Sequence, residues 1–143
     1  MASYEDHVLL EATRFRRAIE DAKQAGDLDA PHPGFRDFPQ GSCGAATVML
    51  CTYLAERGLD GWLYACGKRE NPHETHAWAE REGLVVDITA DPFPEHGTVY
   101  VAPRTPWFDT WEPSYGPPKV DRVAPDDDYT EGPAYQAILR HLP

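Results

Sequence analysis

The stretch GSCGAATVMLCTYLAERGL, at 41–59, holds an apolar run that begins at a cysteine. Ser42 stands where a helix N-cap belongs, and Gly58 stands where a C-terminal cap glycine belongs. Between these two residues the sequence leaves little polar surface on any side of a helix. A helix that is apolar nearly all round lies in a core. The pattern therefore predicts a central helix over 43–57, with Cys43 as its first residue.

On the N-terminal side, residues 5–25 have the periodicity of an amphipathic helix. Their apolar side chains recur at alternating steps of four and three residues and so share one face: Val8, Ala12, Phe15, Ile19 and Ala22. The segment 27–41 contains three prolines and two glycines, which predicts a loop. This loop would connect the amphipathic helix to the central one.

On the C-terminal side, four short segments have the composition of strands: 61–66, 75–81, 84–89 and 98–102. A tight turn at Glu82 and Gly83 would join the second and third strands into an antiparallel hairpin. In a hairpin whose paired residue numbers sum to about 164, position 76 faces about position 88. His76 and Asp87 should then be adjacent or diagonal neighbours.

The last third of the chain changes in composition. Ten of the fourteen prolines fall at or after Pro92. We expect an irregular wrap over 92–133, whose aromatic residues pack on the sheet or rim a cleft, and a short closing helix over 133–142. A chain of 143 residues predicts one domain, 1–143, with the motif-bearing core at about 41–93.

The net charge and the cysteine content restrict the classes of partner and the cellular compartment that we expect. The chain has 24 acidic and 13 basic residues, a net charge of −11, which argues against nucleic acid and anionic membranes as partners. No segment approaches the ~18 apolar residues of a membrane span, and the N-terminus lacks the features of a signal peptide. Three cysteines form no disulfide framework, so we expect reduced thiols in a cytoplasmic protein. Nothing in the sequence indicates the oligomeric state.

Three residues suggest nucleophilic catalysis: Cys43, His76 and Asp87. Only the thiolate form of a cysteine attacks well, and both a helix N-terminus and a nearby imidazolium favour the thiolate. The imidazole then delivers a proton to the leaving group. A carboxylate on its other nitrogen fixes the tautomer and orientation of the ring.

The segments GSCGAATVMLCTYLAERGL, THAWAE and GLVVDITADPF together resemble the transglutaminase-like branch of the papain-fold cysteine enzymes. That branch has a cysteine at the start of a central helix, a His-Ala-Trp strand and an aspartate on the following strand. The resemblance covers about 41–93 and is similar in motif order to the maturation proteases of lasso peptides. It implies an α+β, papain-like fold, with the central helix packed on a small antiparallel sheet. It also implies cofactor-free acyl chemistry on the amides of a peptide or protein through Cys43, His76 and Asp87.

Two further residues are candidates for substrate or oxyanion contacts. Gln40 could donate a side-chain N–H to the oxyanion, beside the backbone N–H of Cys43. The string QGSCG also occurs in papain-type proteases, but their nucleophile stands three places further on, where this chain has Ala46. That comparison therefore cannot assign Gln40. Trp78 could wall the cleft or fill the core.

Other interpretations remain open for these residues. Cys43 could be a packing residue, and Cys51 and Cys66 are expected in the core. His73 and His76 could hold zinc together with a cysteine, but the HExxH pattern is absent, and we expect no metal. The whole chain could be a catalytically inactive papain-fold module that binds a peptide or protein in the same cleft.

Overall fold

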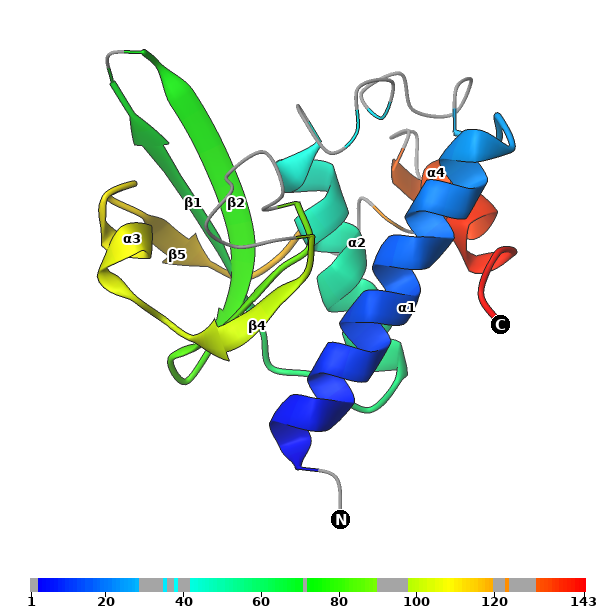
Figure 1. Ribbon diagram of the computed structural model, residues 1–143, viewed down its shortest axis with the longest axis horizontal. Coiled ribbons are helices and arrows are strands. Elements are labelled where there is room, and N and C mark those ends of the chain that lie inside the picture. The colour runs from blue at the N-terminus through cyan, green and yellow to red at the C-terminus, as the bar shows by residue number, and fades with distance from the viewer. Residues whose placement is uncertain are drawn as a thin grey trace.

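The computed structural model describes residues 3–28, 35, 38, 42–70, 72–89, 98–119, 123 and 131–143. The fold is α+β, with helices packed against a five-stranded antiparallel sheet (Figure 1). The helices are α1 (Tyr4–Gln24), α2 (Cys43–Glu56), α3 (Pro106–Asp109) and α4 (Glu131–Leu139). The strands are β1 (Leu63–Arg69), β2 (Glu74–Arg81), β3 (Leu84–Asp87), β4 (Tyr100–Pro103) and β5 (Ser114–Gly116). Their order across the sheet is β4-β3-β2-β1-β5.

The two faces of the sheet carry separate hydrophobic cores. The larger core joins α1, α2 and α4 to one face, and the smaller one joins Phe108 and Trp111 to the other. Successive side chains of a strand point to opposite faces. Accordingly Trp78 of β2 belongs to the smaller core and its neighbour Ala79 to the larger core. In Figure 1, α2 stands beside the sheet with α1 and α4 next to it, and α3 lies at the opposite side of the strands.

Both predicted N-terminal helices are confirmed. The apolar face predicted for α1 is fully buried, and Ser3 and Asp6 close its first turn by exchanging hydrogen bonds with each other's backbone N–H. Helix α2 begins at Cys43 as predicted and is followed by Gly58 with φ +81°. Ser42 occupies the N-cap position, but its side chain makes no capping hydrogen bond.

The predicted end of the first strand is wrong, because Gly67 lies inside β1. A Cβ at this position would lie 2.3 Å from the backbone oxygen of Trp111, an oxygen that accepts a hydrogen bond from the backbone N–H of Lys68. Glycine is present there because another backbone passes too closely for a side chain. The strand therefore continues through Gly67, which pairs with His76 of β2, to Arg69.

We expect Gly67→Ala to destabilise the protein by about 2 kcal/mol or more, since the methyl group must displace the backbone of Trp111. Gly116→Ala is the matched control, because a Cβ at Gly116 of β5 meets nothing within 4 Å. Urea unfolding of both variants checks the prediction. Equal midpoints for the two variants would show that the close approach at Gly67 does not matter for stability.

The C-terminal third is more regular than predicted. Sequence reasoning missed α3 and β5, which lie in the predicted wrap of 92–133. Phe108 and Trp111 pack on the sheet, which is one of the two predicted roles for these aromatic residues. Residues 92–97, 120–122 and 124–130 of the wrap lie outside the described part of the chain. The closing helix is present as α4.

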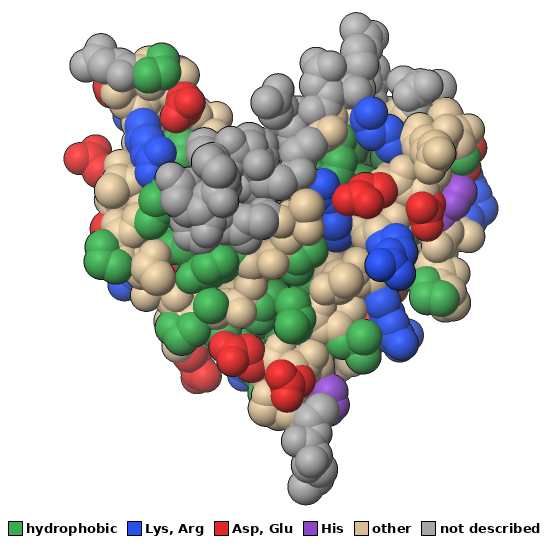
Figure 2. All heavy atoms as spheres, in the orientation of Figure 1, with side chains coloured by type: hydrophobic (Ala, Val, Ile, Leu, Met, Phe, Trp, Pro, Cys, Tyr) green, Lys and Arg blue, Asp and Glu red, His purple; other side chains and the backbone are tan. Residues whose placement is uncertain are grey.

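Within the described ranges, no helix combines the length and the apolar character that crossing a membrane requires. Figure 2 shows that positive and negative side chains are interspersed on the face that carries α1. The negative net charge is thus not gathered into a single acidic field on this face.

Candidate active site

Cys43 lies at the first position of the most apolar helix of the fold. Helix α2 packs on β1 and β2, and its second and third turns are almost wholly buried. The thiol itself is half-buried and forms no disulfide. A helix N-terminus carries a partial positive charge and unpaired backbone N–H groups. The fold therefore holds this thiol in a fixed place where an anion is favoured.

His76 and Asp87 come from neighbouring strands and meet as predicted. Arg81 pairs with Leu84 and Ala79 with Val86, so the paired residue numbers sum to 165. Continued by one pair, this register places Asp87 opposite Trp78 and diagonal to His76. The Nε2 atom of His76 lies 2.6 Å from Oδ2 of Asp87, and both side chains are buried. The hairpin thus builds one hydrogen-bonded pair.

The second carboxylate oxygen of Asp87 is held by Thr89. Oδ1 accepts hydrogen bonds from the backbone N–H of Thr89 at 3.0 Å and from its hydroxyl at 3.4 Å. An aspartate that bonds the backbone two residues on forms a turn, and this turn ends β3 at Asp87 instead of at the predicted residue 89. Asp87 is therefore fixed from both sides, by Thr89 and by His76.

Arg16 is a support of the site that sequence reasoning missed. It is only 6% exposed. Its Nη1 donates to the carbonyl of Ile88 at 2.6 Å and to that of Thr98 at 3.3 Å, while Nε donates to Glu20 at 2.7 Å. The guanidinium thus anchors α1 to the residue that follows Asp87. The spacing held a signal, because Arg16 lies four residues after Ala12 and therefore borders the apolar face, whereas the exposed Arg17 lies opposite it.

Arg16→Met should lower the free energy of unfolding by about 2 kcal/mol, because the buried carbonyl of Ile88 loses its donor. Arg17→Met is the matched control: Arg17 is exposed on the same helix, and we expect a change within about 0.5 kcal/mol. Chemical denaturation measures both. If Arg16→Met lowers the free energy of unfolding no more than Arg17→Met does, Arg16 does not anchor α1 in this way.

The surroundings of His76 favour its protonated form. Burial alone would lower the pKa of the imidazole, but the hydrogen bonds to Asp87 and Cys43, with the charges of those groups, outweigh burial and raise the pKa to about 9. The ring is also surrounded by Trp78, Trp107 and Trp111, with ring centroids at 5.9, 6.2 and 5.5 Å. The raised pKa favours the imidazolium form of His76 at neutral pH.

This raised pKa predicts that stability falls as the pH rises. The native state holds the proton of His76 between its ordinary pKa near 6.5 and about 9, while the unfolded state releases it. The stabilisation that protonated His76 adds to the free energy of unfolding is therefore complete below about pH 6.5 and is lost toward pH 9. It amounts to about 3 kcal/mol, since the pKa rises from 6.5 to about 9 and each pKa unit corresponds to about 1.4 kcal/mol.

Urea unfolding between pH 6 and 9 measures this loss. It is best followed in a Cys43→Ser background, where position 43 no longer titrates. The loss should be smaller there than in wild type, because Cys43 contributes to the raised pKa of His76. Asp87→Asn in the same background is the control, because it removes the carboxylate charge and should flatten the dependence. If the free energy of unfolding falls equally steeply with pH in the presence and absence of the carboxylate, the pH dependence does not come from His76.

The other two cysteines differ from each other. Cys51 is buried in α2, and this burial raises the pKa of its thiol to about 12. Its expected place in the core is confirmed. Cys66 is half-buried in the middle of β1, so its prediction as a core residue at a strand end is wrong. The cause is again Gly67, through which the strand continues.

Of the two candidate substrate residues, the structure describes only Trp78. Trp78 is fully buried in the smaller core, and its indole N–H donates to Glu80 at 3.2 Å. A ring without exposed surface cannot contact a substrate, so the prediction of a cleft wall is corrected to a core role beside His76. Gln40 lies outside the described residues.

A zinc site was the other open interpretation of the histidines. His73 lies on an exposed turn before β2 and contacts Glu70 at 3.2 Å, whereas His76 is bonded to Asp87. In the described part of the chain, no cluster of three or more His, Cys, Asp or Glu residues could hold a metal ion.

Comparison of the chain with protein-family models, with curated proteins and with solved structures finds no match.

Proposed function

We propose that this chain is a cysteine-dependent amide acyl enzyme with the papain-like fold of the transglutaminase-like branch. One observation carries the proposal: the buried imidazole of His76 lies 2.6 Å from the carboxylate of Asp87, and its pKa is raised by Asp87 and Cys43 together. The sequence resemblance around Cys43, His76 and Asp87 supports it, because these residues come together as the motif order implies. Cys51 has neither a charged partner nor exposure, so Cys43 is the better nucleophile.

The geometry suggests the following steps. Cys43 acts as the thiolate of an ion pair in which His76 holds the thiol proton. The thiolate attacks the amide carbon, and its negative charge passes to the carbonyl oxygen. The backbone N–H of Cys43, free of an intrahelical acceptor at the helix start, is a donor for this oxyanion. As the C–N bond breaks, His76 gives its proton to the leaving nitrogen and a thioester remains. Water or an amine then attacks the thioester and passes a proton back to His76.

In these reaction steps, Asp87 acts as a positioning residue. It keeps Nε2 occupied, which leaves Nδ1 as the nitrogen for proton exchange in the proposed steps, and it stabilises the imidazolium. Thr89 and Arg16 act through Asp87 by fixing the turn behind it. The smaller core around Trp111 keeps water from the ring.

Intact-mass analysis after incubation with cell extract tests this proposal. The wild-type chain should gain a mass on Cys43 that hydroxylamine removes, because hydroxylamine cleaves thioesters. Cys43→Ala should gain none, while Cys51→Ala serves as the control and should behave as wild type. A chain that captures partners without covalent attachment, with wild type and Cys43→Ala alike, would instead be a peptide-binding module.

A further inference from the structure

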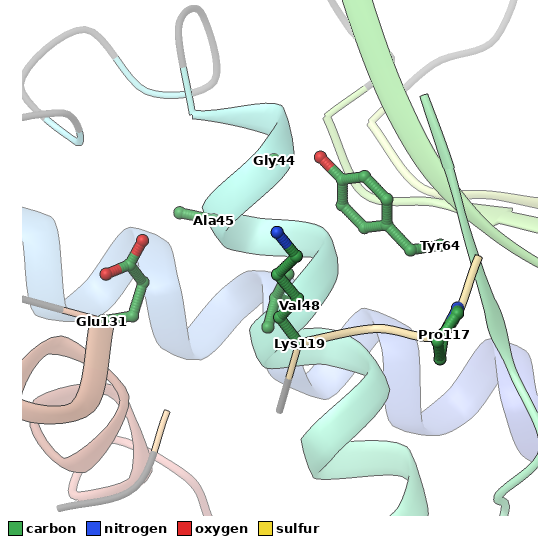
Figure 3. Close-up of a pocket in the computed structure, with 7 residues that line it drawn as sticks. All are labelled: Gly44, Ala45, Val48, Tyr64, Pro117, Lys119 and Glu131. Atoms are coloured by element: carbon green, nitrogen blue, oxygen red, sulfur yellow. The ribbon is translucent and has the colours of Figure 1, made fainter. Parts of the chain in front are cut away.

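The pocket of about 260 Å³ in Figure 3 lies on the side of the sheet that α2 covers. Gly44, Ala45 and Val48 form its wall on α2, and neither Cys43 nor His76 is among the residues that line it. The three tryptophans beside the imidazole belong to the smaller core or pack against it, on the other face of the sheet. The smaller core, and not this pocket, therefore contacts the ring of His76.

Trp111 lies beside His76 because the neighbouring strand carries a glycine. Gly67 of β1 pairs with His76 of β2, so a side chain at position 67 would stand on the same face of the sheet as the imidazole. Trp111 fills that space: a Cβ at Gly67 would lie 2.8 Å from its Cβ. Its backbone oxygen accepts a hydrogen bond from the N–H of Lys68 at 2.8 Å. The backbone of β1 thus fixes one of the rings that surround the imidazole.

Trp107 has fewer constraints than Trp111. It lies in α3, a helix of four residues, which is too short to be stable without tertiary contacts. Its side chain is half-buried, whereas Trp78 and Trp111 are fully buried. The ring meets the imidazole of His76 edge-on, with 6.2 Å between the centroids and 80° between the planes. The position of this ring therefore depends on the side chains that pack against it.

Arg69 packs against both of these tryptophans. It lies two residues after Gly67 in β1, and its side chain therefore points to the same face of the sheet. Its guanidinium carbon lies 4.0 Å from the ring centroid of Trp111 and 4.9 Å from that of Trp107. Its Nε and Nη2 donate to the hydroxyl of Thr110 at 3.1 and 2.6 Å, and this hydroxyl donates to the carbonyl of Trp107 at 2.6 Å. One side chain thus connects both tryptophans and the end of α3 to β1.

We propose that Arg69 is a positioning residue of the proposed reaction: it fixes the two tryptophans, and these hold the ring of His76 toward Cys43. The inference rests on the proposed function, because the orientation of the ring matters only if His76 exchanges a proton with Cys43. A guanidinium suits this role, since its planar face stacks on an indole while its N–H groups donate hydrogen bonds in the plane. Arg69 acts through these rings and does not need to touch the substrate.

The rate at which iodoacetamide alkylates Cys43 at about pH 6.5 tests this inference, because the rate reports the thiolate that the imidazolium stabilises. The sulfur bonds to the methylene carbon and iodide leaves. Arg69→Met should lower this rate about fivefold, since a cation–π contact of an exposed side chain is worth a factor of this order. Arg81→Met is the matched control, because Arg81 is also half-buried but stacks on Tyr4, at 5.0 Å. It should change the rate by less than about 1.5-fold.

A double-mutant cycle separates this role from a general loosening of β1. In a His76→Ala background, Arg69→Met should lower the rate of Cys43 no further, because Arg69 acts only through the imidazole. The rate of Cys66, which lies in the same strand as Arg69, should stay within about 1.5-fold of wild type. Arg69→Lys keeps a cation and should recover part of the loss. Thr110→Val removes only the hydroxyl and should lower the rate of Cys43 about twofold; if Arg69→Met does not fold, these two variants complete the cycle.

Two failures can be told apart. If iodoacetamide labels Cys43 of the wild type no faster than Cys66, the proposed function fails and this inference fails with it. If Cys43 is selectively labelled but Arg69→Met leaves its rate unchanged, or lowers it equally in the absence of His76, Arg69 has a structural role only and the proposed function stands. A parallel change in the rate of Cys66 would overturn the inference in the same way.

Discussion

If the proposed function holds, Cys43→Ala should abolish turnover while leaving the fold intact. The loss should exceed about 10⁴-fold, because every later step of the proposed mechanism requires the thioester on Cys43. The thiol is half-buried at the first position of α2 and fills no core space. We therefore expect the free energy of unfolding to change by no more than about 1 kcal/mol.

Turnover and chemical denaturation of the same preparation check this prediction. Cys66→Ala is the matched control, since Cys66 is also half-buried but lies in β1, where it is neither at a helix start nor bonded to His76. It should keep most of the activity. Equal activity of wild type and Cys43→Ala would exclude Cys43 as the nucleophile.

Replacing Asp87 with alanine should have the second largest effect, on stability and on activity together. The buried imidazolium loses its carboxylate and the N–H of Thr89 loses its acceptor. Removing one partner of a buried ion pair destabilises a protein by about 3–5 kcal/mol. At pH 9 and above the loss should be smaller, because His76 then approaches its neutral form in wild type as well.

Comparing the activities of Asp87→Ala and Asp87→Asn should separate the effect of the charge of Asp87 from the effect of its hydrogen bond. We expect Asp87→Ala to lower kcat by about 10²–10⁴-fold, as for loss of an oriented acid–base group. Asp87→Asn keeps the shape and a hydrogen-bonding oxygen, so it should recover part of this loss and shift the pH profile to lower pH. If alanine and asparagine were equally active with unchanged pH profiles, Asp87 would have a packing role only.

The periodic elements were predictable from sequence. The apolar face of α1, the apolar run of α2 and the turn at Glu82-Gly83 each follow a local rule, and each is present. The hairpin register was predicted to within one residue number, which sufficed to pair His76 with Asp87. The geometry of the candidate site was therefore largely readable from the hairpin and the helix start.

The contacts between distant segments were not predictable. Gly67 has the appearance of a strand end, and only the backbone of Trp111, far along the chain, explains why it lies inside β1. Arg16 borders the apolar face of α1, but its role depends on the position of Ile88, 72 residues away. The prolines of the C-terminal third mask α3 and β5, whose positions follow from packing on the sheet.

The most direct test of the central claim is the alkylation rate of each thiol by iodoacetamide between pH 5.5 and 8.5. The account predicts that Cys43 reacts at least about tenfold faster than Cys66 below pH 7, because a thiolate beside an imidazolium is the reactive form. Cys51, buried in α2, should remain unlabelled in the native protein. His76→Ala should bring Cys43 down to the rate of Cys66. Equal and slow labelling of Cys43 and Cys66, unaffected by the loss of His76, would contradict the claim that these groups form a reactive site.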